Sequence, residues 1–151
     1  MGRDYTLFTF LREQFSTLQP TTADLTGRTV IVTGGNIGLG KEVARQFLAM
    51  HPAKLVLAVR SIEKGELSLR FPDLWVIVVV GQLAAREIIE ATRNTQADVV
   101  EVWELDLGSF ASTKSFADRV ERELQRLDIL VENAGVATAQ WSTTSDGYET
   151  T

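Results

Sequence analysis

The sequence predicts an α/β fold, in which a parallel sheet with flanking helices extends as far as a fourth core strand. Three observations lead to this prediction. Short runs of β-branched and other apolar residues alternate along the chain with segments of helical period. These runs are continuously apolar, which is typical of strands buried on both faces. A glycine-rich turn follows the first run and leads directly into a helix. Such alternation favours right-handed βαβ units.

Composition narrows the class of protein further. The 151 residues suffice for one domain, and 44% of them are apolar, which is enough for a core. A net charge of −5 without basic runs argues against a nucleic-acid partner. The absence of cysteine excludes disulfides and Cys-ligated metals, and it fits a reducing, cytoplasmic compartment. The single histidine, His51, precedes Pro52 in an expected surface turn, so we predict no metal site.

Residues 1–23 are predicted to form an N-terminal amphipathic extension. Its apolar residues recur with helical spacing: Leu7, Phe8, Phe10, Leu11 and Phe15. Polar residues interrupt this pattern too often for a signal peptide, and a membrane-surface anchor is disfavoured because Lys-rich flanks are missing. We therefore expect a helix on the domain surface or at a subunit contact. No spanning segment is predicted, since the most apolar window, 74–80, is far shorter than the roughly 20 residues required.

The remaining residues, 24–151, are predicted to form one unit with four core strands. The strands are expected at about 28–33, 54–59, 98–104 and 128–131. A first helix at about 37–50 ends at Met50-His51-Pro52, and a second at about 110–125 begins with Ser109 as its N-cap. On the second helix, Phe116, Val120 and Leu124 are predicted to face inward. A polar loop follows at 138–147, and Asp146-Gly147-Tyr148-Glu149 is expected to begin another helix.

The segment at 67–83 interrupts the regular pattern. Its β-type run, Trp75-Val76-Ile77-Val78-Val79-Val80, predicts an extra strand on the sheet edge or a surface hairpin arm. Helical patterns lie on both sides, at 62–66 and 84–91. Removing about 16 residues would join them into one helix of ordinary length. We therefore interpret 67–83 as a probable insertion, of the kind that a retained intron translated in frame would produce.

The glycine-rich turn at 33–41 can be compared with three nucleotide-binding loops. The fingerprint G-x-G-x-x-G does not match, because the glycines stand at 34, 38 and 40. A P-loop nearly matches from Gly35 to Lys41, but Glu42 stands where a hydroxyl should bind magnesium, and a carboxylate there would repel a triphosphate. The pattern Thr-Gly-x-x-x-Gly-x-Gly matches in full, as Thr33-Gly34-Gly35-Asn36-Ile37-Gly38-Leu39-Gly40. The helix that follows points its unpaired N–H groups at this turn, which suits a phosphate.

This third pattern resembles the cofactor signature of the short-chain dehydrogenase/reductase family. Further stretches resemble the same family in the same order: Asp106-Leu107, and Asn133-Ala134-Gly135 after the fourth strand. Asp24-Leu25-Thr26-Gly27 and Asp146-Gly147-Tyr148-Glu149 look like its retinol-dehydrogenase-like branch. The resemblance implies a Rossmann-type NAD(P)-binding domain, present here as its N-terminal cofactor-binding half. The cofactor residues it implies, together with Arg60, are Thr33, Gly34, Asn36, Ile37, Gly38, Leu39, Gly40, Asp106, Leu107, Asn133, Ala134 and Gly135.

Arg60 bears on which dinucleotide is bound. It ends the second strand, where the adenosine ribose of a dinucleotide arrives. An acidic residue there would accept from a 2′-hydroxyl, whereas a guanidinium suits a 2′-phosphate. NADP(H) is therefore favoured over NAD(H). The alternative, that Arg60 is only a solvated charge at the end of the strand, stays open. Glu132 stands where the family usually has a second Asn, and it either bonds a ribose hydroxyl or faces outward.

The family's chemistry is hydride transfer between nicotinamide and a ketone or secondary alcohol. It uses a Tyr-x-x-x-Lys pair with Ser and Asn, and no such pair occurs here, because Tyr5 and Tyr148 lack the lysine. We therefore predict no catalytic residue in this chain and interpret it as a truncated form of a longer oxidoreductase that acts on a small carbonyl or alcohol. The expected protein partner is a second copy, in a homo-oligomer. The alternative is a non-catalytic dinucleotide-binding or subunit-interaction fragment.

Overall fold

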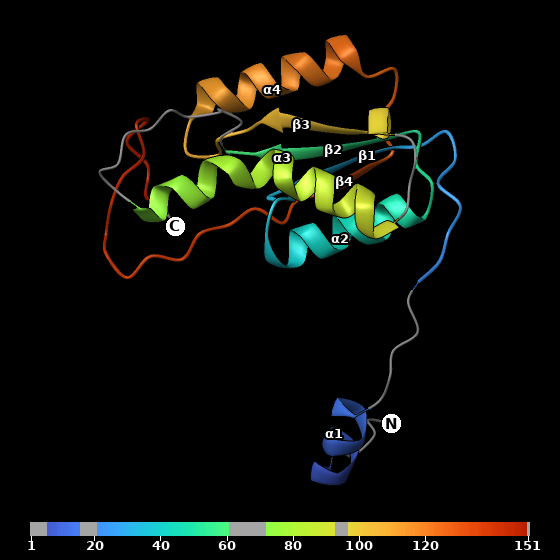
Figure 1. Cartoon of the computed structure of the whole chain (residues 1–151). Helices are drawn as coiled ribbons and strands as arrows, with labels where there is room; N and C mark the ends of the chain where they lie inside the picture. Colours follow the sequence, from blue (N-terminus) through green and yellow to red (C-terminus); the bar gives the residue numbers. More distant parts are fainter. Residues whose placement is uncertain (1–5, 16–20, 61–71, 93–96, 151) are drawn as a thin grey trace, which may run out of the picture.

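A computed structural model of the chain describes residues 6–15, 21–60, 72–92 and 97–150. Four parallel strands form one sheet in the order β3-β2-β1-β4, with helices on both of its faces (Figure 1). The elements in chain order are α1 (Leu7–Gln14), β1 (Thr29–Thr33), α2 (Gly38–Ala49), β2 (Lys54–Val59), α3 (Pro72–Thr92), the short 3₁₀ helix η1 (Ala97–Val99), β3 (Val100–Glu104), α4 (Phe110–Glu123) and β4 (Ile129–Val131). The predicted Rossmann-type parallel sheet is confirmed.

The strand order places a topological switch between β1 and β4. From β1 the chain moves outward through β2 to β3, and it then returns to place β4 on the other side of β1. In the register, Ile31 lies beside Val56 of β2 on one side and Leu130 of β4 on the other. In open parallel sheets, ligands bind outside the carboxyl ends of the strands at such a switch. The fold therefore singles out the loops that follow β1 and β4.

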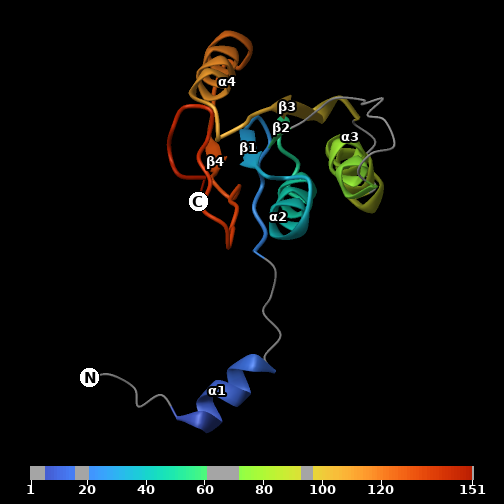
Figure 2. The same ribbon diagram turned by 90° about the vertical axis from the view of Figure 1, so that its left-hand side faces the viewer.

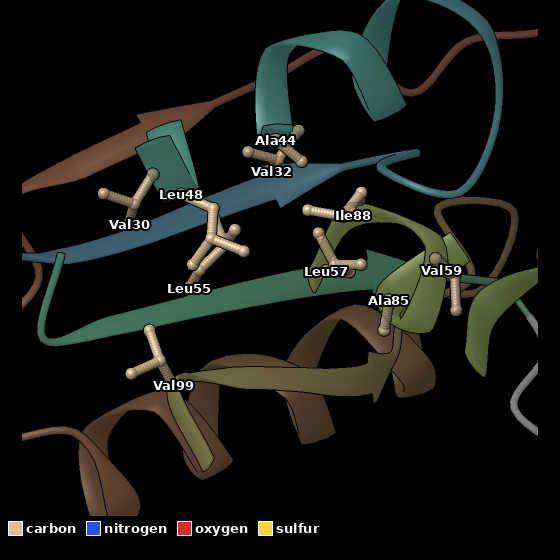
Figure 3. Close-up of a cluster of buried hydrophobic side chains, with 10 residues drawn as sticks. All are labelled: Val30, Val32, Ala44, Leu48, Leu55, Leu57, Val59, Ala85, Ile88 and Val99. Atoms are coloured by element: carbon tan, nitrogen blue, oxygen red, sulfur yellow. The ribbon is translucent and has the colours of Figure 1, made fainter. Parts of the chain in front are cut away.

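Alternate residues of the strands build two separate hydrophobic layers. Figure 2 shows α2 and α3 on one side of the sheet and α4 on the other. The first layer is a cluster of ten buried residues beneath α2 and α3 (Figure 3): Val30, Val32, Ala44, Leu48, Leu55, Leu57, Val59, Ala85, Ile88 and Val99. The second contains Ile31, Val56, Ala58, Trp103 and Leu105. As predicted, Phe116 and Val120 of α4 pack against it, together with Leu124 at the C-cap of this helix. Arg119 of α4 also stacks 4.0 Å above the centre of the Trp103 ring.

The predicted core elements are confirmed to within about two residues at each end, as expected for helix and strand boundaries. Ser109 caps α4 with its side chain, which accepts from the backbone N–H of Ser112. Helix α2 ends before Pro52, where His51 adopts a left-handed backbone with φ of 59°. N-terminal helix α1 is also present; its apolar side chains are exposed, and it lies apart from the sheet in both views (Figures 1 and 2).

Two local predictions are wrong. The run at 75–80 is neither an edge strand nor a hairpin arm, because it belongs to α3, a continuous helix of 21 residues. A short apolar run fits a buried helix as well as a strand, and the crossover between parallel strands such as β2 and β3 is usually a helix. The predicted helix at 62–66 lies outside the described residues. Residues 146–149 form a turn instead of a helix, with an antiparallel bridge between Thr143 and Glu149. Within the described residues, no helix is both long and apolar enough to cross a membrane.

Asp128 fixes the start of β4 against the start of β1. Its carboxylate accepts from the backbone N–H of Thr29 at 2.9 Å and from the Arg28 guanidinium at 2.7 Å, and Arg126 donates to both carboxylate oxygens. The Asp128 backbone N–H in turn donates to the Thr29 carbonyl at 3.0 Å. Hydrogen bonds from Arg126, Thr29 and Arg28 hold the pKa of the Asp128 carboxyl well below its ordinary value.

This network predicts a specific effect of pH on stability. Because the folded pKa of Asp128 is depressed, its contribution is complete above the unfolded pKa of about 4 and is lost as pH falls toward the folded value. Asp128→Asn should lower the urea midpoint at pH 7 and make its decline in acid shallower. Urea unfolding from pH 7 down to about 2 measures both effects. Asp118→Asn, which removes an exposed ion pair with Lys114, is the control and should change little. An unaltered acid slope in Asp128→Asn would contradict the assignment.

Candidate functional site

The glycine-rich turn lies at the switch between β1 and β4. Its first glycine, Gly34, has a φ of 64° and donates its N–H to the Ala58 carbonyl of β2 at 2.8 Å. Gly38, the first residue of α2, has a φ of 55°. Both conformations lie in the left-handed region that favours glycine. The chain can therefore turn sharply from the end of β1 into the first turn of α2.

The side chain of Thr33 joins this turn to the loop that follows β4. Its hydroxyl oxygen accepts the backbone N–H groups of Asn133 and Ala134, both at 2.9 Å, and its hydroxyl donates to the Val131 carbonyl at 3.2 Å. The Asn133 amide nitrogen donates in return to the carbonyl oxygens of Thr33 and Gly34, at 3.0 and 3.4 Å. Two motifs that are 100 residues apart in the sequence thus form one hydrogen-bonded unit.

The glycines of the turn differ in what surrounds them. A Cβ added to Gly40 would lie 2.4 Å from both the Asn133 amide nitrogen and the Gly34 carbonyl oxygen, so α2 could not pack here with any side chain at 40. A Cβ on Gly34 would come within 3.0 Å of the Ala134 Cα. A Cβ on Gly38, in contrast, would meet nothing within 4 Å. The backbone at Gly38 therefore faces open space at the start of α2.

None of the residues that the structure describes caps the N-terminus of α2 with its side chain. Its N-cap residue, Ile37, makes no side-chain capping hydrogen bond, and the first turn contains no acidic residue. Ile37 and Leu39 are 64% and 81% exposed despite being apolar. The first N–H groups of a helix need acceptors and carry part of the positive end of the helix dipole. This combination of exposed backbone donors and positive potential suits an anionic group such as a phosphate.

The other predicted residues follow the neighbouring strands at the same edge of the sheet. Arg60 is exposed and comes directly after β2, and Asp106 and Leu107 come just after β3. The Leu105 N–H donates to the Val59 carbonyl at 2.8 Å, which keeps the ends of β2 and β3 side by side. Gly135 is exposed beyond the Thr33–Asn133 unit, and Asn36 is half-buried within the turn. The structure thus joins 33–40 to 133–134 directly and places Arg60 and Asp106-Leu107 along the same edge.

Beside this site lies a charged groove that the sequence did not predict. It has a volume of about 250 Å³ between α2 and α3, and it is lined by Gly38, Lys41, Glu42, Arg45, Glu87, Ile88 and Ala91. Lys41, the last residue of the stretch that nearly matches a P-loop, forms an ion pair with Glu87 of α3. Glu42 is held by hydrogen bonds from Arg45 and Gln46, which lower its pKa to about 2. Contacts between separate helices leave no local signal in the sequence, so Glu87 could not have been found.

The sequence matches the family described as short chain dehydrogenase over residues 73–149. It is 38% identical over 138 residues to a short chain dehydrogenase/reductase of Cryptosporiopsis sp. (strain 8999), covering 91% of this chain and 37% of that protein. It is also 38% identical over 130 residues to retinol dehydrogenase 12 of Mus musculus, covering 86% of this chain and 35% of that protein. The chain therefore spans little more than a third of the length of these relatives. An alignment over 91% of the chain necessarily includes the turn at 33–40.

Solved structures of other proteins share the fold of this chain. The menthone neomenthol reductase of Mentha piperita superposes with a TM-score of 0.58 at 28% identity, covering 74% of this chain and 32% of that one. A short-chain dehydrogenase of Sphingobium yanoikuyae, solved in complex with NADPH, superposes with a TM-score of 0.55 at 25% identity. The match covers 80% of this chain and 39% of that one. The chain therefore has the Rossmann-type fold of these enzymes. The chain belongs to the short-chain dehydrogenase/reductase family, which confirms the resemblance and rejects the P-loop interpretation.

The link between the two loops can be tested at Thr33, which is only 5% exposed. Thr33→Val keeps the shape of the side chain but leaves the N–H groups of Asn133 and Ala134 without their acceptor. We expect a loss of about 1–3 kcal/mol in the free energy of unfolding, with faster amide exchange at 133–134. Urea unfolding and hydrogen exchange measure the two effects. Thr33→Ser, which retains the hydroxyl, should have nearly the native free energy of unfolding and nearly the native exchange rates. Equal losses of stability in both variants would show that the hydroxyl is unimportant.

Proposed function

We propose that this chain binds NADP(H) at the carboxyl edge of its sheet, as the dinucleotide-binding part of an oxidoreductase that interconverts a ketone and a secondary alcohol. The observation that carries this proposal is the unprotected N-terminus of α2. Exposed Ile37 and Leu39 flank the open backbone at Gly38, and within the described part of the chain no side chain caps the helix. In helix α4, on the other face of the sheet, the side chains of Asp146 and Ser109 accept the N–H groups of Phe110 and Ser112. The contrast supports an external anion as the partner of α2.

The remaining residues of the edge fit the other parts of a dinucleotide. The N–H groups of residues 37–40 would hold the pyrophosphate, and Arg60 would pair with a 2′-phosphate. Asp106 and Leu107 would contact the adenine, and Asn133-Ala134-Gly135 would line the nicotinamide side of the switch. When bound, the cofactor supplies or accepts a hydride at its nicotinamide ring. These residues bind and orient it, and the Thr33–Asn133 unit keeps the two loops in place.

Preference for NADP(H) over NAD(H) rests on Arg60. Its exposed guanidinium follows β2 at the expected ribose position, and charge-assisted hydrogen bonds to a phosphate are among the stronger polar contacts. The similar Sphingobium yanoikuyae enzyme was solved in complex with NADPH, which supports the same preference here. We extend the proposal to a cytoplasmic location, where disulfides are rare, which fits a sequence without cysteine. We also propose residues 24–151 as the binding unit, with 67–83 as an insertion within it.

Titration with NADPH and NADH tests the cofactor proposal. We expect the native chain to bind NADPH more tightly than NADH, and Arg60→Ala to weaken NADPH about 10- to 100-fold while leaving NADH nearly unchanged. Nucleotide fluorescence measures both affinities. Arg122→Ala removes a cation that pairs with Glu123 on α4, and as the control it should alter neither affinity.

Two results would contradict the proposal in different ways. Equal affinity for NADPH and NADH, with equal effects of Arg60→Ala on both, would remove the role of Arg60. Binding of Mg-ATP in place of either dinucleotide would remove the dinucleotide site itself.

We further propose that this chain does not catalyse hydride transfer by itself, because it contains no Tyr-x-x-x-Lys pair. The expected result is cofactor binding without measurable oxidation of NADPH by a panel of aliphatic and aromatic ketones. A non-catalytic binding or subunit-interaction role would give the same result for this chain. A fusion in which the remaining two thirds of a relative's sequence follow residue 151 separates the two functions. Activity would appear only if this chain is the cofactor-binding part of an oxidoreductase. Turnover by the 151-residue chain alone would refute this part of the proposal.

A further inference from the structure

Residues 142–150 fold into a closed turn, here named the clasp. The Thr150 N–H donates to the Ser142 carbonyl at 3.0 Å, and the hydroxyls of the same two residues lie 2.9 Å apart. Within this closure, the Thr144 N–H donates to the Tyr148 carbonyl at 2.7 Å. These bonds join the two ends and the middle of the segment. The clasp is therefore a compact unit with a shape of its own.

The clasp is attached to the first residues of α4. The Asp146 carboxylate accepts the Phe110 backbone N–H at 2.7 Å, across 36 residues of sequence. The rings of Phe110 and Tyr148 pack with their centres 5.2 Å apart, tilted by 58°. The Thr144 methyl group lies 3.8 Å from where a Cβ on Gly108 would be, so it borders the turn before the helix. A carboxylate at a helix N-terminus is also favoured by the helix dipole.

The turn to which the clasp is attached carries the proposed adenine-binding residues. Asp106 accepts the Gly108 N–H with its side chain at 2.9 Å and donates its own N–H to the Ser112 hydroxyl at 2.9 Å. The Ser109 N–H donates to the Asp106 carbonyl at 3.1 Å. Since Ser112 belongs to the first turn of α4, the position of Asp106 depends on the position of that turn. Whatever fixes the start of α4 also fixes Asp106 and its exposed neighbour Leu107.

From these contacts we propose that the clasp is a positioning element for the adenosine half of the cofactor. Asp146 and Tyr148 hold the start of α4, and α4 holds Asp106 and Leu107 in the arrangement that receives the base. The inference rests on the proposed function, because it assigns a role within the same binding site. It adds residues 142–150, which are far from the glycine-rich turn in the sequence, to the determinants of cofactor affinity.

The test uses adenosine 2′,5′-bisphosphate, which carries only the adenosine half of NADP, and NADPH as the full cofactor. Asp146→Ala should weaken both by about tenfold, as expected for the loss of one hydrogen bond to a charged group. Asp146→Asn retains an oxygen acceptor and should restore most of the affinity. Tyr148→Ala should weaken both ligands, whereas Tyr148→Phe, which keeps the ring, should not. Asp118→Ala, on an exposed part of α4, is the matched control and should have no effect.

Hydrogen exchange separates positioning from general loss of structure. In Asp146→Ala, exchange should become faster at 106–112 and stay native at 29–44, which covers the glycine-rich turn. Unchanged affinity in both Asp146→Ala and Tyr148→Ala would overturn the proposal. Faster exchange at 29–44 together with the loss of affinity would also overturn it, because the clasp would then support the whole domain. If the native chain binds neither ligand, the proposed function itself fails, which is a distinct result.

Discussion

The contact between Thr33 and the loop after β4 is the constraint on which the site depends. Strands β1 and β4 are neighbours because, after β3, the chain crosses back over the sheet and adds its next strand on the other side of β1. The loops that follow β1 and β4 are therefore far apart in the sequence, and no local contact holds them together. One buried hydroxyl accepts two backbone N–H groups of the second loop, and Asn133 donates back to the first. Asp128 performs the matching role at the opposite ends of these two strands. Side chains that join the strands at both ends thus set the register in which the loops meet.

Helices α2 and α4 both begin at the carboxyl edge of the sheet, but they differ in how their first N–H groups are bonded. Helix α4 uses Ser109 and, through the clasp, Asp146, both of which belong to the chain itself. Helix α2 starts at Gly38 without such a cap and presents exposed Ile37 and Leu39 to the solvent. An uncapped helix end with bulky apolar neighbours is costly unless something else accepts its hydrogen bonds. This difference supports the proposed anion site at α2, whereas the first N–H groups of α4 are already bonded within the chain.

Sequence reasoning predicted well those features that depend on neighbouring residues. The strands follow from runs such as Val30-Ile31-Val32, the cap at Ser109 from local hydrogen bonding, and the turn at 33–40 from the spacing of its glycines. It failed where distant packing decides the outcome. The β-branched run at 75–80 lies in the crossover from β2 to β3, which is usually a helix in parallel sheets. Residues 146–149 form a turn in which Asp146 accepts the N–H of Phe110, the first residue of α4. The Lys41–Glu87 ion pair joins two helices and has no sequence signature.

The glycine pattern also acquires a different meaning from the structure. From the sequence, Gly34, Gly38 and Gly40 together let the backbone approach a pyrophosphate and let helix pack on strand. The structure divides these tasks, since Gly34 and Gly40 lie against residues 133–134 and a side chain at either would collide with them. Of these three glycines, only Gly38 combines a left-handed backbone with open space where a Cβ would lie. Two of the three glycines therefore serve the junction between the β1 and β4 loops. The spacing Gly-x-x-x-Gly-x-Gly thus depends on the Asn-Ala-Gly motif as much as on the cofactor, which gives a physical reason for both motifs to occur in one chain.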